Sequence, residues 1–310
     1  MIPPALAPLR LPALAAPMFL TSGPDLVVEC CRAGVVGCFP ALNARSTAEF
    51  ADWLDEIEGR LAPGAAPFGV NLIVHRSNPR LEADLRVAVE RRVPLIVTSL
   101  GAVPEVVSTV QAAGGLVFHD VINRRHGEKA AAVGVDGIIA VAVGAGGHGG
   151  TLSPFALIAE LREVFDGCLV LAGAINTGAQ VLAARVMGAD MVSIGSRFIA
   201  TREATVSEEQ KRMYVGARAS DVVYTPAVSG VHANFLRQSL ENNKISLDEL
   251  PAHSKLDLGS EARAWKTIWS AGHGVGGIGD IPGAAELCDR LVDEYRTACA
   301  AVAADPFALS

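Results

Sequence analysis

The sequence lacks the features that mark a membrane protein or a nucleic-acid-binding protein. It contains no uninterrupted apolar run of about 20 residues, the length that a membrane-spanning helix requires. It has no block of like charges, and its net charge is −7 at pH 7. An acidic chain without a basic patch is a poor partner for nucleic acid or for an anionic membrane surface. We therefore expect neither nucleic acid nor a membrane as a partner.

The cysteines lack the spacing of a disulfide framework or of a metal site. The 310 residues include six cysteines, and no two of them form a CxxC pair. Cys168 lies inside an apolar run, as a small buried residue would. The apolar N-terminal stretch is interrupted by prolines and by Arg10, which is unlike a signal peptide. These features favour a reduced, cytoplasmic protein without a metal site.

Hydrophobic residues make up 50% of the chain, and many of them gather in eight short runs. Each run is continuously apolar rather than alternating, which is typical of parallel strands that are buried on both faces. The runs are LAAPMFL (14–20), VVGCFP (35–40), FGVNLIV (68–74), LIVTSL (95–100), LVFHDV (116–121), GIIAVAV (137–143), CLVLAGA (168–174) and MVSIGS (191–196).

The segments between these runs carry the signals that begin and end helices. Ser46 and Thr177 are suited to cap a helix N-terminus, and Pro24 is suited to a first helical turn. Gly34 and Gly188 stand where a helix would end. Eight strand–helix units predict an α/β fold, a (β/α)8 TIM barrel, with a doubly wound open sheet as the alternative.

The chain continues well beyond the eighth run, where its character changes. We expect the barrel over 1–203 and a small helical addition on the substrate side over 204–264. Residues 265–310 combine a glycine-rich stretch with an amphipathic segment. We expect this part to form a loop and a final helix that packs back on the barrel.

Polar residues and glycines collect where the predicted strands end. In a TIM barrel the carboxyl ends of the strands form the catalytic face. Each of these residues has an ordinary structural explanation when taken alone, but together they indicate a site. They are Pro17, Met18, Asn71, Thr98, Ser99, His119, Asp120, the glycine-rich loop 144–150, Gly173, Gly195 and Ser196.

The seventh and eighth runs end in a pattern that suits a phosphate. LAGAIN (171–176) and SIGSRF (193–198) each lead through a tight turn into a predicted helix. Backbone amides at helix N-termini bind anions, and the loops after strands 7 and 8 are the usual phosphate site of TIM barrels. We therefore predict a phosphate-bearing ligand, with two ordinary tight turns as the alternative.

The segment GAGGHGG (144–150) contains a single side chain with acid–base chemistry, His148. Glycines allow a backbone to approach a ligand without a clash from Cβ. An imidazole titrates near neutral pH, so it can take or give a proton. His148 is therefore the predicted catalytic residue, with a role limited to hydrogen bonding as the alternative.

Several of these motifs, in this order, resemble those of one enzyme family. AAPMF, FGVNL, AGGHGG, LAGAI, GSRFIAT and IWSAGHGVGGIGDIP are similar to motifs of the nitronate monooxygenase (2-nitropropane dioxygenase) family, which is related to the flavin-dependent enoyl-ACP reductases. The resemblance implies an FMN-binding TIM barrel with a small helical domain at its mouth. It implies that His148 stands on the substrate side of the flavin ring. The FMN-binding residues it implies are Ala16, Pro17, Met18, Asn71, Gly146 and Gly147 near the ring, and Gly173, Ala174, Gly195 and Ser196 at the phosphate.

The chain departs from the family pattern at three places. Asp120 stands where many members carry a lysine near the flavin pyrimidine, and Ala174 stands where glycine is usual. The carboxylate that follows the sixth strand in the family is missing from VAVGAG (141–146). These differences bear on the redox tuning of the flavin and on the reaction.

Three functions are open from the sequence. The first is an FMN-dependent nitronate monooxygenase that oxidises alkyl nitronates with O2 to a carbonyl compound and nitrite. The second is a flavin reductase that uses NADH or NADPH to reduce an enoyl thioester or a quinone. The third is a non-redox lyase or isomerase that binds the phosphate of its substrate. A homodimer is compatible with each of them.

Overall fold

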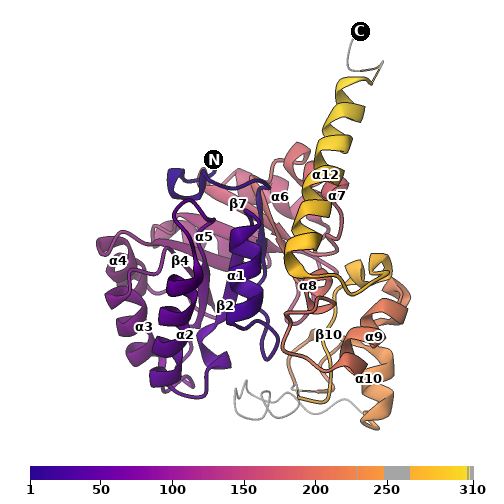
Figure 1. Cartoon of the computed structure of the whole chain (residues 1–310), viewed down its shortest axis with the longest axis horizontal. Coiled ribbons are helices and arrows are strands. Elements are labelled where there is room, and N and C mark those ends of the chain that lie inside the picture. Colours follow the sequence, from indigo (N-terminus) through magenta and orange to yellow (C-terminus); the bar gives the residue numbers. More distant parts are fainter. Residues whose placement is uncertain (229, 248–265, 306, 308–310) are drawn as a thin grey trace.

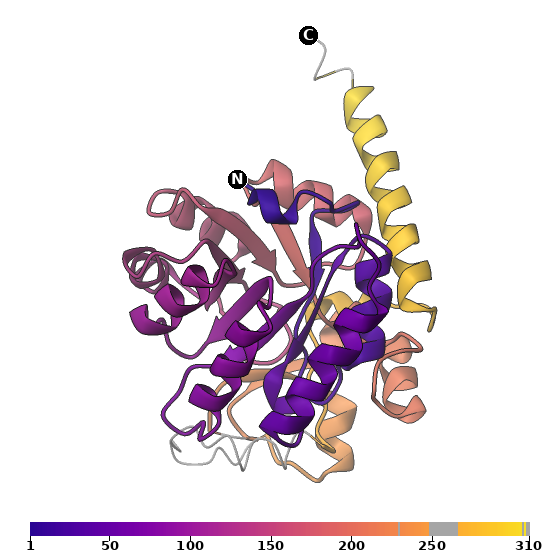
Figure 2. The same ribbon diagram turned by 60° about the vertical axis from the view of Figure 1, so that its left-hand side comes forward.

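Eight parallel strands close into a barrel in the order in which they occur in the sequence. The structure is a computed structural model, and it describes residues 1–228, 230–247, 266–305 and 307. The first strand pairs with the eighth, Leu14 opposite Ser193, so the predicted TIM barrel is confirmed and the open sheet is excluded (Figures 1 and 2). The strands are β1 (Ala13–Ala15), β2 (Val36–Pro40), β3 (Gly69–Ile73), β4 (Leu95–Ser99), β5 (Leu116–Val121), β6 (Gly137–Val141), β7 (Cys168–Ala172) and β8 (Met191–Ile194).

The helices surround the strands and begin where the sequence predicts. The hydroxyls of Ser46 and Thr177 accept hydrogen bonds from the third residue of the helices that they cap. Gly34 and Gly188 have φ of +81° and +107°, the left-handed conformation that favours glycine just past a helix end. The helices of the barrel, with two short 3-10 turns, are η1 (Pro4–Leu6), α1 (Pro24–Arg32), η2 (Ala41–Asn43), α2 (Thr47–Arg60), α3 (Leu81–Glu90), α4 (Pro104–Ala112), α5 (Arg124–Ala132), α6 (Pro154–Arg162), α7 (Gly178–Val186) and α8 (Ser196–Ile199).

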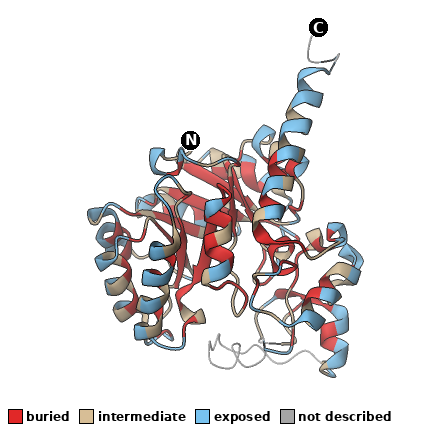
Figure 3. Ribbon diagram, viewed as in Figure 1, coloured by how far each residue is buried: buried red, intermediate tan, exposed pale blue. Residues whose placement is uncertain are grey.

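The strands are buried on both faces, which explains their continuous apolar runs (Figure 3). One apolar cluster fills the inside of the barrel, with Leu14, Val97 and Phe118 among its members and Leu6 of η1 joining it. A second, larger cluster lies between the strands and the helices. Cys168 is fully buried inside the barrel, as predicted.

The segment after α8 differs from the predicted helical addition because it also contains a small sheet. Two four-residue strands, β9 (Val222–Thr225) and β10 (Ala233–Leu236), pair with each other in antiparallel fashion and not with the barrel. The strands are too short to stand out from their surroundings in the sequence. The other elements of this part are α9 (Glu208–Gly216), η3 (Ala219–Asp221), α10 (Arg237–Asn242) and η4 (His273–Gly277). Residues 248–264 of the predicted addition lie outside the described residues.

The final helix, α12 (Ala284–Ala303), packs against α7 and α1. Its first half buries Leu287 and Leu291 against the outer core, so the expected return to the barrel is observed. Its second half is exposed and extends beyond the barrel (Figures 1 and 3). Within the described part of the chain, no helix combines the length and the apolar character needed to cross a membrane.

Candidate active site

A cavity of about 1470 Å³ opens where the barrel strands end. The segment after α8 contributes part of its wall, including Tyr214, Tyr224 and Ser270. Pockets for one drug-sized ligand measure about 300–1,000 Å³, so this space can hold a cofactor together with a second molecule. Thr98, which the sequence also placed at this face, does not line it. The predicted catalytic and cofactor-binding residues all line it: Ala16, Pro17, Met18, Asn71, Gly146, Gly147, His148, Gly173, Ala174, Gly195 and Ser196.

The loop after β1 presents backbone to the cavity and is held by side chains behind it. The Ala16 amide donates to the Ile194 carbonyl at 2.9 Å, which extends the barrel ladder by one residue beyond β1. The Met18 amide donates to Ser22 Oγ at 3.0 Å, and Asn43 Nδ2 donates to the Met18 carbonyl at 3.0 Å. Ser22 and Asn43 therefore fix the part of the wall that the resemblance assigns to the flavin ring.

The loops after β7 and β8 present backbone to the cavity, as a phosphate site would need. Gly173 has φ of +132° and Ala174 has φ of +57°, so the chain leaves the strand conformation at both residues. A Cβ built on Gly195 would meet nothing closer than the Ala16 Cβ at 3.8 Å and the Met18 Sδ at 3.9 Å. That face of Gly195 is therefore open to the cavity, and the residues present fit a phosphate-bearing cofactor.

A second glycine-rich segment covers these loops. Ser196 Oγ accepts a hydrogen bond from the Gly272 amide at 2.8 Å, and its own proton is still available for a ligand. A Cβ on Gly274 would lie only 3.3 Å from the Ala174 carbonyl carbon. The segment 272–274 thus packs directly on the residues predicted to bind phosphate.

The glycines of the loop 144–150 are explained largely by contacts within the protein. From the sequence we expect these glycines to let the loop approach a ligand. A Cβ on Gly146 would lie 3.0 Å from the Gly272 amide, and one on Gly272 would lie 2.5 Å from the Gly144 carbonyl. A Cβ on Gly150 would lie 2.5 Å from the Val141 carbonyl. The close neighbour of this loop is therefore a second backbone segment of the same chain, in addition to the cavity.

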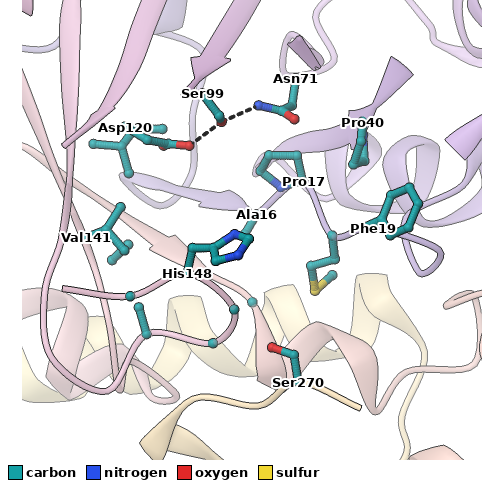
Figure 4. A pocket seen from close by; sticks show the side chains of 18 of the residues that line it. Ala16, Pro17, Phe19, Pro40, Asn71, Ser99, Asp120, Val141, His148 and Ser270 are labelled. Atoms are coloured by element: carbon teal, nitrogen blue, oxygen red, sulfur yellow. Dashed lines mark hydrogen bonds between the residues drawn. The ribbon is translucent and has the colours of Figure 1, made fainter. Parts of the chain in front are cut away.

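His148 is placed by a residue that the sequence did not single out. Asn234 on β10 is buried, and its backbone amide donates to the Gly147 carbonyl at 2.9 Å. Its side-chain Nδ2 donates to the Ala145 carbonyl at 2.6 Å. These bonds hold the loop on both sides of Gly146, and Figure 4 shows the half-buried imidazole of His148 pointing into the cavity. No motif surrounds Asn234, so its role was not predictable from the sequence.

Asn71, Ser99 and Asp120 form a hydrogen-bonded row across three neighbouring strands (Figure 4). The sequence suggested that Asn71 lies at the end of β3. In the structure it lies in the middle of that strand. Its Nδ2 donates to the Val97 carbonyl at 3.1 Å and to Ser99 Oγ at 2.8 Å. Ser99 Oγ then donates to Asp120 Oδ2 at 2.5 Å. The donors of Asn71 are therefore used within the protein, and its carbonyl oxygen is left for a ligand.

Two titratable groups are neighbours in the sequence of β5, the buried His119 and the half-buried Asp120. Burial raises the pKa of Asp120 to about 6, and the hydrogen bond from Ser99 opposes this rise. Burial lowers the pKa of His119 to about 4, although its Nδ1 lies 2.8 Å from Thr98 Oγ1. His119 is therefore a neutral imidazole at physiological pH, and Asp120 is a carboxyl group that can change charge in a mildly acidic range.

The outer rim of the cavity combines apolar side chains with basic ones. Leu100, Ile122 and Tyr224 are large hydrophobic residues that are exposed at this mouth. His126 and Lys129 of α5 line the same opening. Such a rim suits a ligand with an apolar body and an anionic end.

Comparison with known sequences places this chain in a family. The model of the family described as nitronate monooxygenase matches residues 4–294. The chain is 27% identical over 277 residues to nitronate monooxygenase of Paraburkholderia phytofirmans, with 74% of each chain covered. It is 28% identical over 232 residues to the (3aS,4S,5R,7aS)-5-hydroxy-7a-methyl-1-oxo-octahydro-1H-indene-4-carboxyl-CoA dehydrogenase of Rhodococcus jostii. That match covers 75% of this chain but only 64% of the relative's length.

Solved structures share the fold. Nitroalkane oxidase from Streptomyces ansochromogenes superimposes with a TM-score of 0.83 at 24% identity, covering 96% of this chain and 99% of the other. FabK from Thermotoga maritima gives a TM-score of 0.81 at 22% identity, with 96% of each chain covered. At these identities the likeness extends to the fold alone.

Proposed function

The chain belongs to the nitronate monooxygenase family of oxidoreductases, and from this premise we propose that it is an FMN-dependent nitronate monooxygenase. The reaction would oxidise an alkyl nitronate with O2 to a carbonyl compound and nitrite. Membership in this family implies a flavin. The choice of FMN rests on the phosphate cradle of Gly173, Ala174, Gly195 and Ser196.

One observation carries the proposal: His148 and the loops after β7 and β8 line the same cavity. A phosphate held by the loop amides would fix one end of the cofactor. The loop after β1 would support the ring, and the Asn71 carbonyl oxygen would accept a hydrogen bond from it. Bound in this way, FMN supplies the electron-transfer chemistry that no side chain of the cavity can provide.

His148 would bind and orient the nitronate, or would remove a proton from the parent nitroalkane. A nitronate is already an anion, so its oxidation needs no general base. A neutral nitroalkane must first lose a carbon-bound proton, and an imidazole titrates in the range in which it can accept one. Asn234 keeps the loop in place for either role through its two hydrogen bonds.

The first test is the identity of the cofactor and of the electron donor. The purified protein should be yellow and should release FMN, not FAD, on denaturation. Anaerobic mixing with a panel of nitronates should bleach the flavin, and aerobic turnover should yield nitrite. A colourless protein that also fails to bind added FMN would contradict the flavin assignment and would favour a non-redox reaction on a phosphate-bearing substrate.

The size and rim of the cavity favour a second candidate, an NAD(P)H-dependent reductase of an enoyl thioester or a quinone. A small nitronate does not require about 1470 Å³ or an apolar rim with His126 and Lys129. One relative carries a carboxyl-CoA group in the name of its substrate. Rapid anaerobic bleaching by NADH or NADPH, with none by nitronates, would support this candidate over the first.

A further inference from the structure

Asp120 is an acidic side chain on the wall of the cavity, and a fixed row of hydrogen bonds positions it. Val97, Asn71 and Ser99 set the direction of that row. The Val97 carbonyl can only accept, so the nitrogen of the Asn71 amide must face it at 3.1 Å. The second N–H of this nitrogen then points to Ser99 Oγ at 2.8 Å. Ser99 consequently uses its proton to donate to Asp120 Oδ2.

Because Ser99 donates to Oδ2 of Asp120, the other carboxyl oxygen, Oδ1, is left to interact with a ligand. Oδ2 accepts from Ser99 whether or not the carboxyl group is ionised. Within the described part of the chain, Ser99 is the one hydrogen-bond partner of Asp120, and no ion pair includes it. Asp120 lines the cavity, so a proton gained by the carboxyl group is carried on Oδ1 and can be donated to a ligand.

The groups that face Asp120 do not neutralise its charge. From β2, the Cys38 thiol is the titratable group that interacts with it, and burial raises the pKa of that thiol so that it stays neutral. Ser99 on β4, which donates to Asp120, and Ile139, its register partner on β6, carry no charge. His119 on β5 itself is a neutral imidazole, because burial lowers its pKa to about 4.

Other charged or titratable groups line the same cavity, and Arg80 among them is ion-paired with Asp84. They are Arg80, His126, Lys129, His148, Tyr214, Tyr224 and His232. His148 approaches from the glycine-rich loop, and His126 and Lys129 approach from α5. None of them forms an ion pair with Asp120 in the part of the chain that the structure describes. An anion that enters the cavity therefore meets a carboxylate that no described residue pairs with whenever Asp120 is ionised.

We propose that Asp120 controls the binding of anionic substrates to this cavity: an anion is bound together with one proton, which Asp120 takes up. Ser99 and Asn71 are positioning residues for that carboxyl group. The inference rests on the proposed function in one respect, that the natural anion is a nitronate. When protonated, Asp120 presents an O–H donor to the bound anion, and when ionised it repels the anion.

The size of the effect follows from the fraction of protein with a neutral Asp120. Burial raises the pKa of Asp120 to about 6. About half of the molecules then carry the neutral form at pH 6, and about 1% at pH 8. If only the neutral form binds the anion, the apparent Kd at pH 8 is about 100-fold higher than the intrinsic value.

The test measures nitrate binding to the FMN-loaded protein from pH 5 to pH 8. Nitrate is a planar anion that stays ionised over this range and is not oxidised. Asp120→Asn keeps the size of the side chain and an oxygen that accepts from Ser99, but it cannot ionise. We expect the variant to bind nitrate up to about 100-fold more tightly than the wild type at pH 8 and about equally at pH 5.

Two further variants make the test specific. Asp52→Asn removes the same charge from an exposed position of α2 and should leave the nitrate affinity unchanged. Ser99→Ala removes the hydrogen bond that lowers the pKa of Asp120. In that variant nitrate binding should persist to a higher pH than in the wild type, a shift that a purely structural role of Ser99 would not produce.

Calorimetry gives a second measurement that does not depend on the folding of Asp120→Asn. Nitrate binding in two buffers with different heats of ionisation should show proton uptake close to pH 7. The uptake should persist in His148→Asn, because Asp120 remains. Equal nitrate affinities of wild type and Asp120→Asn at pH 8, or absence of proton uptake, would overturn the proposal. Because nitrate is not turned over, these results stand apart from whether nitronates are oxidised.

Discussion

His148 projects into the cavity from a loop that is otherwise almost free of side chains, so its substitution can separate catalysis from binding. We predict that His148→Asn, which keeps hydrogen bonding but cannot titrate, slows anaerobic flavin reduction by a nitroalkane about 10²–10⁴-fold. Reduction by the matching preformed nitronate should change little, because its proton is already gone. The FMN content should stay close to that of the wild type.

The nitronate serves as the control for the nitroalkane, because it differs only in having already lost its proton. Equal losses for nitroalkane and nitronate, measured across pH, would show that His148 positions the substrate and does not move a proton. Unchanged rates for both forms would leave it with a structural role only.

Gly195 is the residue at which an added side chain would enter the cavity beside the expected phosphate. A carboxylate there would repel the phosphate by about 4 kcal/mol at 4 Å, for an effective dielectric constant of about 20. We predict that Gly195→Asp lowers FMN affinity by at least about 100-fold while the protein remains folded. The matched control is Gly59→Asp on α2, where nothing lies within 4 Å of an added Cβ. Unchanged FMN affinity in folded Gly195→Asp would place the phosphate elsewhere.

At the scale of the elements, the sequence predicted the barrel because its strands are buried on both faces. A strand such as Cys168–Ala172 has no solvent-facing side, so it reads as an unbroken apolar run. The pair β9 and β10 gave no such signal, because Val222–Thr225 and Ala233–Leu236 are short and do not belong to the barrel sheet. Asn71 was placed at the end of a run because it is polar, although it lies within β3 with its side chain toward the cavity.

The contact between β10 and the glycine-rich loop is the element-scale feature that matters most for the site. We predict that Asn234→Ala lowers the free energy of unfolding by about 1–3 kcal/mol, because the buried Ala145 carbonyl loses its hydrogen-bond donor. It should also reduce kcat, since the loop that carries His148 loses one of its two bonds to Asn234. FMN affinity should change less, because the expected phosphate site lies on other loops.

Asn243→Ala provides the comparison for this prediction. Asn243 Nδ2 also donates to two backbone carbonyls, those of Ser239 and Thr267, but Asn243 does not line the cavity. Steady-state kinetics should show a loss of kcat only in Asn234→Ala. Urea unfolding should show a loss of stability in both variants, smaller in Asn243→Ala because its bond to Thr267 is exposed. A similar fall of kcat in both would show that general loosening, rather than the loop contact, is responsible.

At the scale of the whole molecule, the cavity joins segments that are far apart in the sequence. Its wall runs from Ala16 in the first loop to Gly274 near the last helix. The barrel residues of the site were predictable because the fold brings all strand ends to one face. The packing of 272–274 on the glycine-rich loop was not predictable. A glycine-rich segment gives no signal in the sequence that it contacts a second such segment and not a ligand.

The ionisation of Asp120 also affects the stability of the whole protein, and this can be tested without any ligand. The pKa of Asp120 is raised from 3.8 in the unfolded chain to about 6 in the fold. The folded state therefore binds this proton more tightly, so the contribution to stability is complete below pH 3.8 and is lost as the pH rises through about 6. Asp120→Asn stays neutral at every pH and should escape this loss.

We therefore predict that the stability advantage of Asp120→Asn over the wild type is larger at pH 8 than at pH 4, by about 2.4 kcal/mol. His119 acts in the opposite sense, because its lowered pKa makes the fold lose stability as the pH falls from 6.5 toward about 4. That effect is common to both proteins and cancels in the difference. Urea unfolding of the wild type and Asp120→Asn at pH 4, 6 and 8 measures this difference in stability. A difference that does not grow with pH would show that the charge of Asp120 does not destabilise the folded protein.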